Sequence, residues 1–159
     1  MEKIKETEKE HKMIECKIDH MDMFQFKRDF IKKEGEEYVC DGQYTQSSED
    51  EIIPVKFRVE HTYDIFSIFG HLWGDWNQCP SWNAMERKAK EWYEKYDAEL
   101  IQIAHDTLKF QCKRKLTEEE IIALLEDIED FAPNSLDVTD YDVIKAKLMG
   151  EGIFVLWWD

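Results

Sequence analysis

The chain has 159 residues, of which 43% are hydrophobic and 13% aromatic, so it has enough apolar mass for a folded core and differs from disordered chains. Its 36 acidic and 21 basic side chains give a formal net charge of −15. This charge repels phosphate backbones and argues against nucleic-acid binding, whereas it suits a basic protein partner or simply confers solubility.

The N-terminal part is predicted to contain a tail, two strands and a helix. Residues 1–12 are nearly all charged and are expected to form a loose tail or frayed helix before a single domain over residues 13–159. Apolar side chains alternate over residues 13–18, as on a half-buried strand, and recur at helical spacing over residues 23–30. Residues 38–40 form a short apolar segment that suits a strand.

The middle of the chain alternates between polar loops and apolar elements. Residues 42–51 are polar and acidic and indicate a surface loop. Beyond Pro54, apolar and charged residues alternate over residues 55–59, which predicts a strand with one exposed face. A short helix is expected within residues 63–72. Ser81 is placed to cap a helix whose apolar stripe comprises Met85, Ala89, Trp92, Tyr93 and Tyr96.

A hairpin and a helix are predicted next. Residues 100–104 and 108–112 read as strands, and the link between them is short enough for a hairpin. Thr117 and Glu120 form a capping-box pattern ahead of an apolar helix, which Pro133 ends.

The C-terminal segment is predicted to form one more helix and a final strand. Thr139 is placed to cap the helix, and Gly150 is placed to end it. Residues 153–159 begin with a continuous apolar run, which is typical of a strand that is covered on both faces. We therefore expect this strand to be central in its sheet.

The order of these elements predicts the fold class. Strands and helices are interleaved, but not in the regular alternation of a doubly wound fold. We expect an α+β fold in one layered domain, with a mixed sheet of about five to six strands and helices packed mainly on one face.

Four groups of residues in the second half carry a resemblance to a known family. They are Trp76-Asn77-Gln78-Cys79-Pro80, the run Trp92-Tyr93-Glu94-Lys95-Tyr96 continuing into Ala98-Glu99-Leu100, the turn at Asp106, and the terminal Trp157-Trp158-Asp159. In this order, residues 74–159 resemble a mostly bacterial family called domain of unknown function 4253. The resemblance implies the fold and boundaries of this region. It implies no established activity and therefore supplies no catalytic residues.

The chain departs from the family pattern at two places. Asp97 stands where the family usually has glycine, at a helix end that needs a left-handed backbone, which aspartate tolerates better than most residues. Residues 114–116 replace a proline-rich turn. Residues 1–60 match no known pattern.

The loop from Trp73 to Pro80 is the main candidate for a binding site, because it combines large aromatic and polar side chains. We expect this loop and residues 157–159 to come together, and such a meeting would form an aromatic pocket with carboxylates. The alternative is a structural plug, in which the tryptophans close the core and the polar groups satisfy loop amides. The candidate binding residues are Trp73, Asp75, Trp76, Asn77, Cys79, His105, Asp106, Trp157, Trp158 and Asp159.

Two kinds of chemistry are considered at this loop. Cys79 precedes a helix, whose N-terminus lowers a thiol pKa, and His71 or His105 would be the candidate base. His61 could join these histidines around a metal, but none has a recognised ligand spacing. The chain has no glycine-rich phosphate loop and no cysteine-enzyme motif. We therefore assign no catalytic residue, no metal ligand and no cofactor.

Compartment is inferred from the cysteines and the chain start. Cys16, Cys40, Cys79 and Cys112 form no CxxC pair, which argues against a zinc site built on such pairs. The charged start lacks the apolar segment of a secretory signal. No apolar run approaches the roughly 20 residues of a membrane helix. A cytoplasmic protein with free thiols and no membrane contact is the expectation.

Three functions remain open. The first is a binding module for a basic protein, as small immunity proteins neutralise toxins. It rests on charge, size and the lack of a catalytic signature. The others are a structural subunit of an assembly, and a small hydrolase-type enzyme that uses Cys79 or a carboxylate in the Trp-rich loop.

Overall fold

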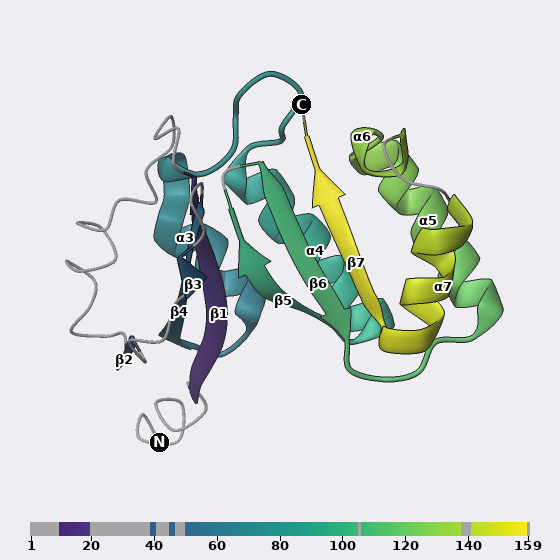
Figure 1. Cartoon of the computed structure of the whole chain (residues 1–159), viewed down its shortest axis with the longest axis horizontal. Helices are drawn as coiled ribbons and strands as arrows, with labels where there is room; N and C mark the ends of the chain where they lie inside the picture. Colours follow the sequence, from purple (N-terminus) through teal and green to yellow (C-terminus); the bar gives the residue numbers. More distant parts are fainter. Residues whose placement is uncertain are drawn as a thin grey trace.

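The computed structural model describes residues 10–19, 39–40, 45–46, 50–104, 106–137 and 141–158. Figure 1 shows one twisted sheet with helices behind it and beside its last strand. The strands are β1 (Glu10–Asp19), β2 (Val39–Cys40), β3 (Thr45–Gln46), β4 (Asp50–Val59), β5 (Ala98–Ile103), β6 (Thr107–Cys112) and β7 (Ile153–Trp157). The helices are η1 (Thr62–Asp64), α3 (Ile65–Phe69), η2 (Gly70–Leu72), α4 (Trp82–Tyr96), α5 (Glu118–Phe131), α6 (Asn134–Asp137) and α7 (Tyr141–Glu151).

The sheet is mixed, which together with the helices confirms the α+β class. Its strand order is β2-β4-β1-β5-β6-β7, and β3 also pairs with β4. β1 runs parallel to β5, whereas the β1–β4, β5–β6 and β6–β7 pairs are antiparallel. The predicted hairpin over residues 100–112 is confirmed as β5 and β6.

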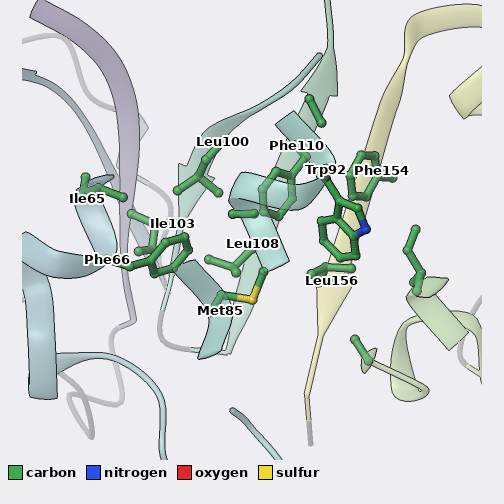
Figure 2. Close-up of a cluster of buried hydrophobic side chains, with 14 of the residues drawn as sticks. Ile65, Phe66, Met85, Trp92, Leu100, Ile103, Leu108, Phe110, Phe154 and Leu156 are labelled. Atoms are coloured by element: carbon green, nitrogen blue, oxygen red, sulfur yellow. The ribbon is translucent and has the colours of Figure 1, made fainter. Parts of the chain in front are cut away.

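One face of the sheet forms the core. The alternation of apolar and polar residues along each strand sends every second side chain to this face. It is covered by α4, and the Trp92 ring lies 5.5 Å from the Phe110 and Phe154 rings, centroid to centroid. Figure 2 shows this cluster, which α3 joins through Ile65 and Phe66. The opposite face keeps the aligned Gln102, Lys109 and Val155 partly or well exposed.

The prediction that the C-terminal strand is central is wrong. Among the described strands, β7 pairs with β6 alone and lies at the end of the sheet. Its other side contacts α6 and α7 instead of a strand. The Ser135 hydroxyl of α6 accepts a hydrogen bond from the Trp157 N–H at 2.8 Å, so a side chain here takes the place of a strand partner. Helices thus cover the outer edge of β7, but its two faces are not both covered, because Val155 is 39% exposed.

Several boundaries also differ from the predictions. β1 begins at Glu10, because its antiparallel ladder continues along the long β4 strand to the Glu10–Val59 pair, so residues 10–12 are strand and not tail. α7 continues through Gly150, and Gly152, with φ of 71°, takes the left-handed position at its end. The helix predicted over residues 23–30 and the cap at Thr139 lie outside the described residues.

Two local predictions at helix ends are confirmed. The Thr117 hydroxyl accepts the Glu120 N–H at 3.2 Å, and the Glu120 carboxylate accepts the Thr117 N–H at 3.0 Å, which completes the capping box. Asp97 ends α4 in the left-handed conformation, with φ of 54° and ψ of 37°. Ser81 stands at the start of α4, but its hydroxyl donates to Asn83 at 2.5 Å and caps no backbone N–H.

Candidate functional site

The Trp-rich loop between η2 and α4 is closed by its own backbone. The Asp75 N–H donates to the Pro80 carbonyl at 3.0 Å, and the Cys79 N–H donates to the Trp76 carbonyl at 2.8 Å. Gly74 has φ of 79°, and a Cβ built on it would lie 2.3 Å from the Pro80 oxygen, so only glycine fits. The loop is a tight, self-bonded turn.

The loop and the C-terminal segment meet, as predicted. Trp73 and Trp158 are each 1% exposed, and their rings pack edge to face with centroids 5.8 Å apart. The Trp73 indole N–H donates to the Ala104 carbonyl at 2.8 Å, and the Trp158 backbone N–H donates to the Asp106 carbonyl at 3.1 Å. These contacts join the loop, the β5–β6 turn and the end of β7.

The shared surface of these segments is filled with rings. Trp73 packs on Phe66 at 5.2 Å, and Trp158 packs on Phe131 at 6.4 Å, so each tryptophan continues into the core. Of the other predicted site residues, Trp76, Trp157 and Asp106 are half-buried, Asp75 and Asn77 are exposed, and His105 and Asp159 lie outside the described residues. The packing matches the structural plug, and a binding role for these residues stays a prediction.

The environment of Cys79 opposes its use as a nucleophile. The residue is 5% exposed. Burial raises the pKa of its thiol to about 12; a backbone hydrogen bond at Asp75 opposes this rise, and the Asp106 and Asp75 carboxylates add smaller increases. A thiol with this pKa stays protonated at neutral pH, whereas nucleophilic cysteines are thiolates.

Metal-ligating side chains do not converge within the described part of the chain. No three His, Cys, Asp or Glu side chains there are grouped so that they could hold an ion. The side chains of Cys16, Cys79 and Cys112 are all buried.

A second region, which the sequence reasoning missed, exposes apolar side chains. We call it the C-terminal surface and define it by the five large hydrophobic side chains that are exposed by 39–56%: Ile122, Tyr141, Val143, Met149 and Val155. They come from α5, α7 and β7, which gather at one end of the molecule in Figure 1. The sequence of α7 does indicate this exposure, because its apolar residues lie all around the helix and not on one stripe that could be buried.

A cavity of about 250 Å³ lies between α7 and β7 in the C-terminal surface. Val143 and Ile144 line it from α7, and Val155 and Trp157 line it from β7. Lys147 is the one ionisable side chain among its lining residues. The cavity could receive an apolar side chain of another molecule.

Carboxylates of α5 accompany these apolar groups. Glu120 is neutralised by Arg114, whose hydrogen bond at 2.6 Å, together with the Thr117 N–H, lowers the pKa of Glu120 to about 2. Glu118 pairs with Lys145 of α7 at 3.4 Å. Four further acids of the helix are exposed and form no ion pair within the described residues: Glu119, Glu126, Glu129 and Asp130. α5 is thus a source of uncompensated negative charge.

Within the described residues, no helix combines the length and apolarity needed to cross a bilayer.

Comparisons with known proteins give one match. No curated protein and no solved structure matches the chain. The family model described as Domain of unknown function (DUF4253) matches residues 55–159, which confirms the resemblance and extends it back into β4. The chain therefore belongs to the DUF4253 family.

Proposed function

We propose that this domain binds a basic protein through the C-terminal surface. The observation that carries the proposal is the distribution of apolar exposure: among the residues whose side-chain exposure the structure describes, the large hydrophobic side chains exposed by 39–56% all lie on α5, α7 or β7. Single exposed hydrophobic residues are ordinary, whereas their collection in one region is typical of interfaces.

The three elements form a connected support for such an interface. α5 contacts α7, and α7 contacts β7. The cavity between α7 and β7 offers a place for an apolar anchor of the partner, because buried anchors in pockets supply most of the binding energy of many interfaces. We assign this role to the cavity lined by Val143 and Trp157.

Charge selects the partner. The uncompensated carboxylates of α5 adjoin the apolar groups, and the whole chain carries a formal net charge of −15. A basic protein would be attracted at long range and would associate faster at low salt. An immunity-like role, in which the domain occupies and neutralises a basic toxin, is one form of this function.

Site-specific photo-crosslinking in the native host tests the proposal. A photoreactive amino acid replaces Val143 on the C-terminal surface, and the matched control carries it at the exposed Gln78 of the Trp-rich loop. We expect the Val143 position to capture a protein that mass spectrometry identifies as basic. Capture should fall in about 0.5 M salt, which shortens the range of electrostatic attraction to a few ångströms.

Charge reversal sharpens the same experiment. The combined variant Glu126→Lys, Glu129→Lys, Asp130→Lys changes three exposed side chains and should abolish capture from Val143 while the fold persists. Equal capture from Gln78, or an acidic partner whose capture ignores both salt and charge reversal, would contradict the proposal.

A structural subunit is the second candidate, and the Val155 side chain of β7, which is 39% exposed, favours it because exposed apolar groups invite association. Two copies joined here would bring two charges of −15 together, so association should strengthen as salt rises. Sedimentation in low and high salt separates the two functions. A salt-promoted oligomer would support the assembly, and a monomer at all salt concentrations would support the basic partner.

A further inference from the structure

A polar cavity of about 440 Å³ lies on a different part of the molecule, between residues 60–64 and one side of α4. One wall holds Glu60, His61, Tyr63 and Asp64, and α4 supplies Glu86, Arg87 and Lys90. None of these residues belongs to the C-terminal surface or to the Trp-rich loop.

The first wall is built from stacked rings. The His61 and Tyr63 rings stack with centroids 4.8 Å apart and an interplanar angle of 13°. The Tyr93 ring of α4 supports both, at 4.8 Å from His61 and 5.8 Å from Tyr63. A wall of packed aromatic rings suits an apolar part of a ligand.

This wall is held rigidly. The His61 N–H donates to the Asp64 carboxylate at 3.0 Å, and the Asp64 N–H donates to the His61 carbonyl at 3.0 Å. Between them, the buried Thr62 hydroxyl accepts the Leu100 N–H of β5 at 3.0 Å. The wall is therefore anchored to the sheet, and a preformed surface of this kind loses little entropy when it binds.

The cavity separates charges of opposite sign. Glu60 and Asp64 stand on the aromatic wall, and Arg87 and Lys90 stand one turn apart on α4. Neither Arg87 nor Lys90 forms an ion pair within the described residues, although acids predominate in the chain. The third acid, Glu86, accepts the Ser67 hydroxyl hydrogen bond at 2.6 Å and stands on α4 with the basic residues, so Glu60 and Asp64 are the acids of the opposite wall.

Acidic side chains stand close to the aromatic wall. Burial, followed by the charges of Asp64, Glu94 and Glu60, raises the pKa of Tyr63 to about 12. A positive group is therefore favoured beside this wall, whereas a negative group is favoured beside Arg87 and Lys90.

We infer that this cavity binds a zwitterionic small molecule of the amino-acid class, with its ammonium group toward Glu60 and Asp64, its carboxylate toward Arg87 and Lys90, and an apolar side chain against the rings. A ligand with one charge would leave one pair of groups without a partner. The inference goes beyond the proposed protein binding and does not depend on it.

The test compares a zwitterion with its two halves. L-Phenylalanine, phenethylamine and 3-phenylpropionate share one ring but carry both charges, only the cation and only the anion. In a two-dimensional NMR titration of the full chain, we expect phenylalanine to shift the amide signals of His61 and Tyr63. Its Kd should be at least about tenfold lower than that of either half, because it gains a second ion pair.

Variants of exposed residues assign the two ends of the ligand. Glu60→Gln should weaken phenylalanine and phenethylamine but leave 3-phenylpropionate unchanged. The double variant Arg87→Gln, Lys90→Gln should weaken phenylalanine and 3-phenylpropionate but leave phenethylamine unchanged. Lys109→Gln, on the far face of β6, is the matched control and should change none of the three.

Either of two results overturns the inference. One is the absence of shifts at His61 and Tyr63 up to about 10 mM phenylalanine, a concentration that detects even weak binding. The other is equal affinity for phenylalanine and one of its halves, which would make the cavity a simple ion site. Both readings come from the wild-type chain and do not depend on the variants.

Discussion

The Trp-rich loop and the C-terminal surface are both rich in apolar side chains, but the loop buries its largest ones and the surface exposes them. The loop has an irregular backbone, but Trp73 and Cys79 are buried, and the ring of Trp158, just after β7, packs on Trp73. The C-terminal surface has regular helices, but Val143 and Met149 are more than half exposed. Irregular backbone with large rings therefore marks closure of the core here, and the candidate interface lies on regular elements.

The largest expected effect comes from a change in the sealed region, the name we give to the buried Trp73, Cys79 and Trp158. Trp158→Ala removes a ring that packs on Trp73 and Phe131 and should lower the free energy of unfolding by about 3–5 kcal/mol. Val143→Ala, on the C-terminal surface, should change it by no more than about 0.5 kcal/mol. Urea unfolding measures both variants. Equal effects would mean that the two regions do not differ as the structure indicates.

The loop backbone gives the next effect. Gly74→Ala must place a Cβ where the Pro80 oxygen stands, at a positive φ, and should cost about 2–3 kcal/mol. Gly70 also has a positive φ of 52°, but nothing lies within 4 Å of its added Cβ, so Gly70→Ala should cost about 1 kcal/mol. Thermal unfolding of the two variants side by side checks the order. A larger loss of stability at Gly70 than at Gly74 would show that the Trp-rich loop can make room for a Cβ at Gly74.

The two buried indoles should respond differently to loss of their N–H groups. Trp73→Phe removes the hydrogen bond to the Ala104 carbonyl, whereas the Trp158 indole N–H is buried without a partner in the described structure. We expect Trp73→Phe to cost about 1–2 kcal/mol more stability than Trp158→Phe, because Trp73→Phe leaves a buried carbonyl unpaired and this carries a desolvation cost. Urea unfolding of both variants measures the difference. Equal losses would show that the Trp73 bond contributes nothing net.

Two of the confirmed predictions have a local origin. The capping box at Thr117 and the left-handed Asp97 depend on a few neighbouring residues, so short sequence patterns predict them. The meeting of Trp73 and Trp158 is long-range, but two Trp-rich segments in an apolar chain have few other places to be buried.

The features that were not predicted depend on which elements become neighbours. β7 has the apolar run of a central strand but lies at the end of the sheet, where α6 and α7 contact it and Val155 stays 39% exposed. The ring stack joins His61 to Tyr93, which meet only when η1 packs on α4. No local pattern carries this information.

The alkaline pH dependence probes the sealed region further. The pKa of Cys79 rises from its ordinary value of 9.0 to about 12 in the folded chain, so folding holds the thiol protonated. The resulting stability is complete below pH 9 and is lost as the pH rises through the folded pKa, on the order of 1 kcal/mol per pH unit. The stability gap between wild type and Cys79→Ala should therefore shrink between about pH 9 and 11.

A buried variant without a titrating group controls for general alkaline effects. Ile121→Val shortens a side chain that is 2% exposed, and its stability gap to wild type should stay constant over the same pH range. Urea unfolding at each pH provides the values. A Cys79→Ala gap that stays constant would mean that the thiol is not held protonated by burial.

The smallest effect on stability belongs to the C-terminal surface and tests its function most directly. Met149→Gln replaces a side chain that is 51% exposed, so unfolding should change by no more than about 0.5 kcal/mol. If the surface exists to bind a partner, the same change should weaken photo-capture from position 143, because apolar contact area is lost at the interface. Unchanged stability with unchanged capture would move the interface away from α7. Lost stability would show that Met149 contributes to folding, as the side chains of the sealed region do.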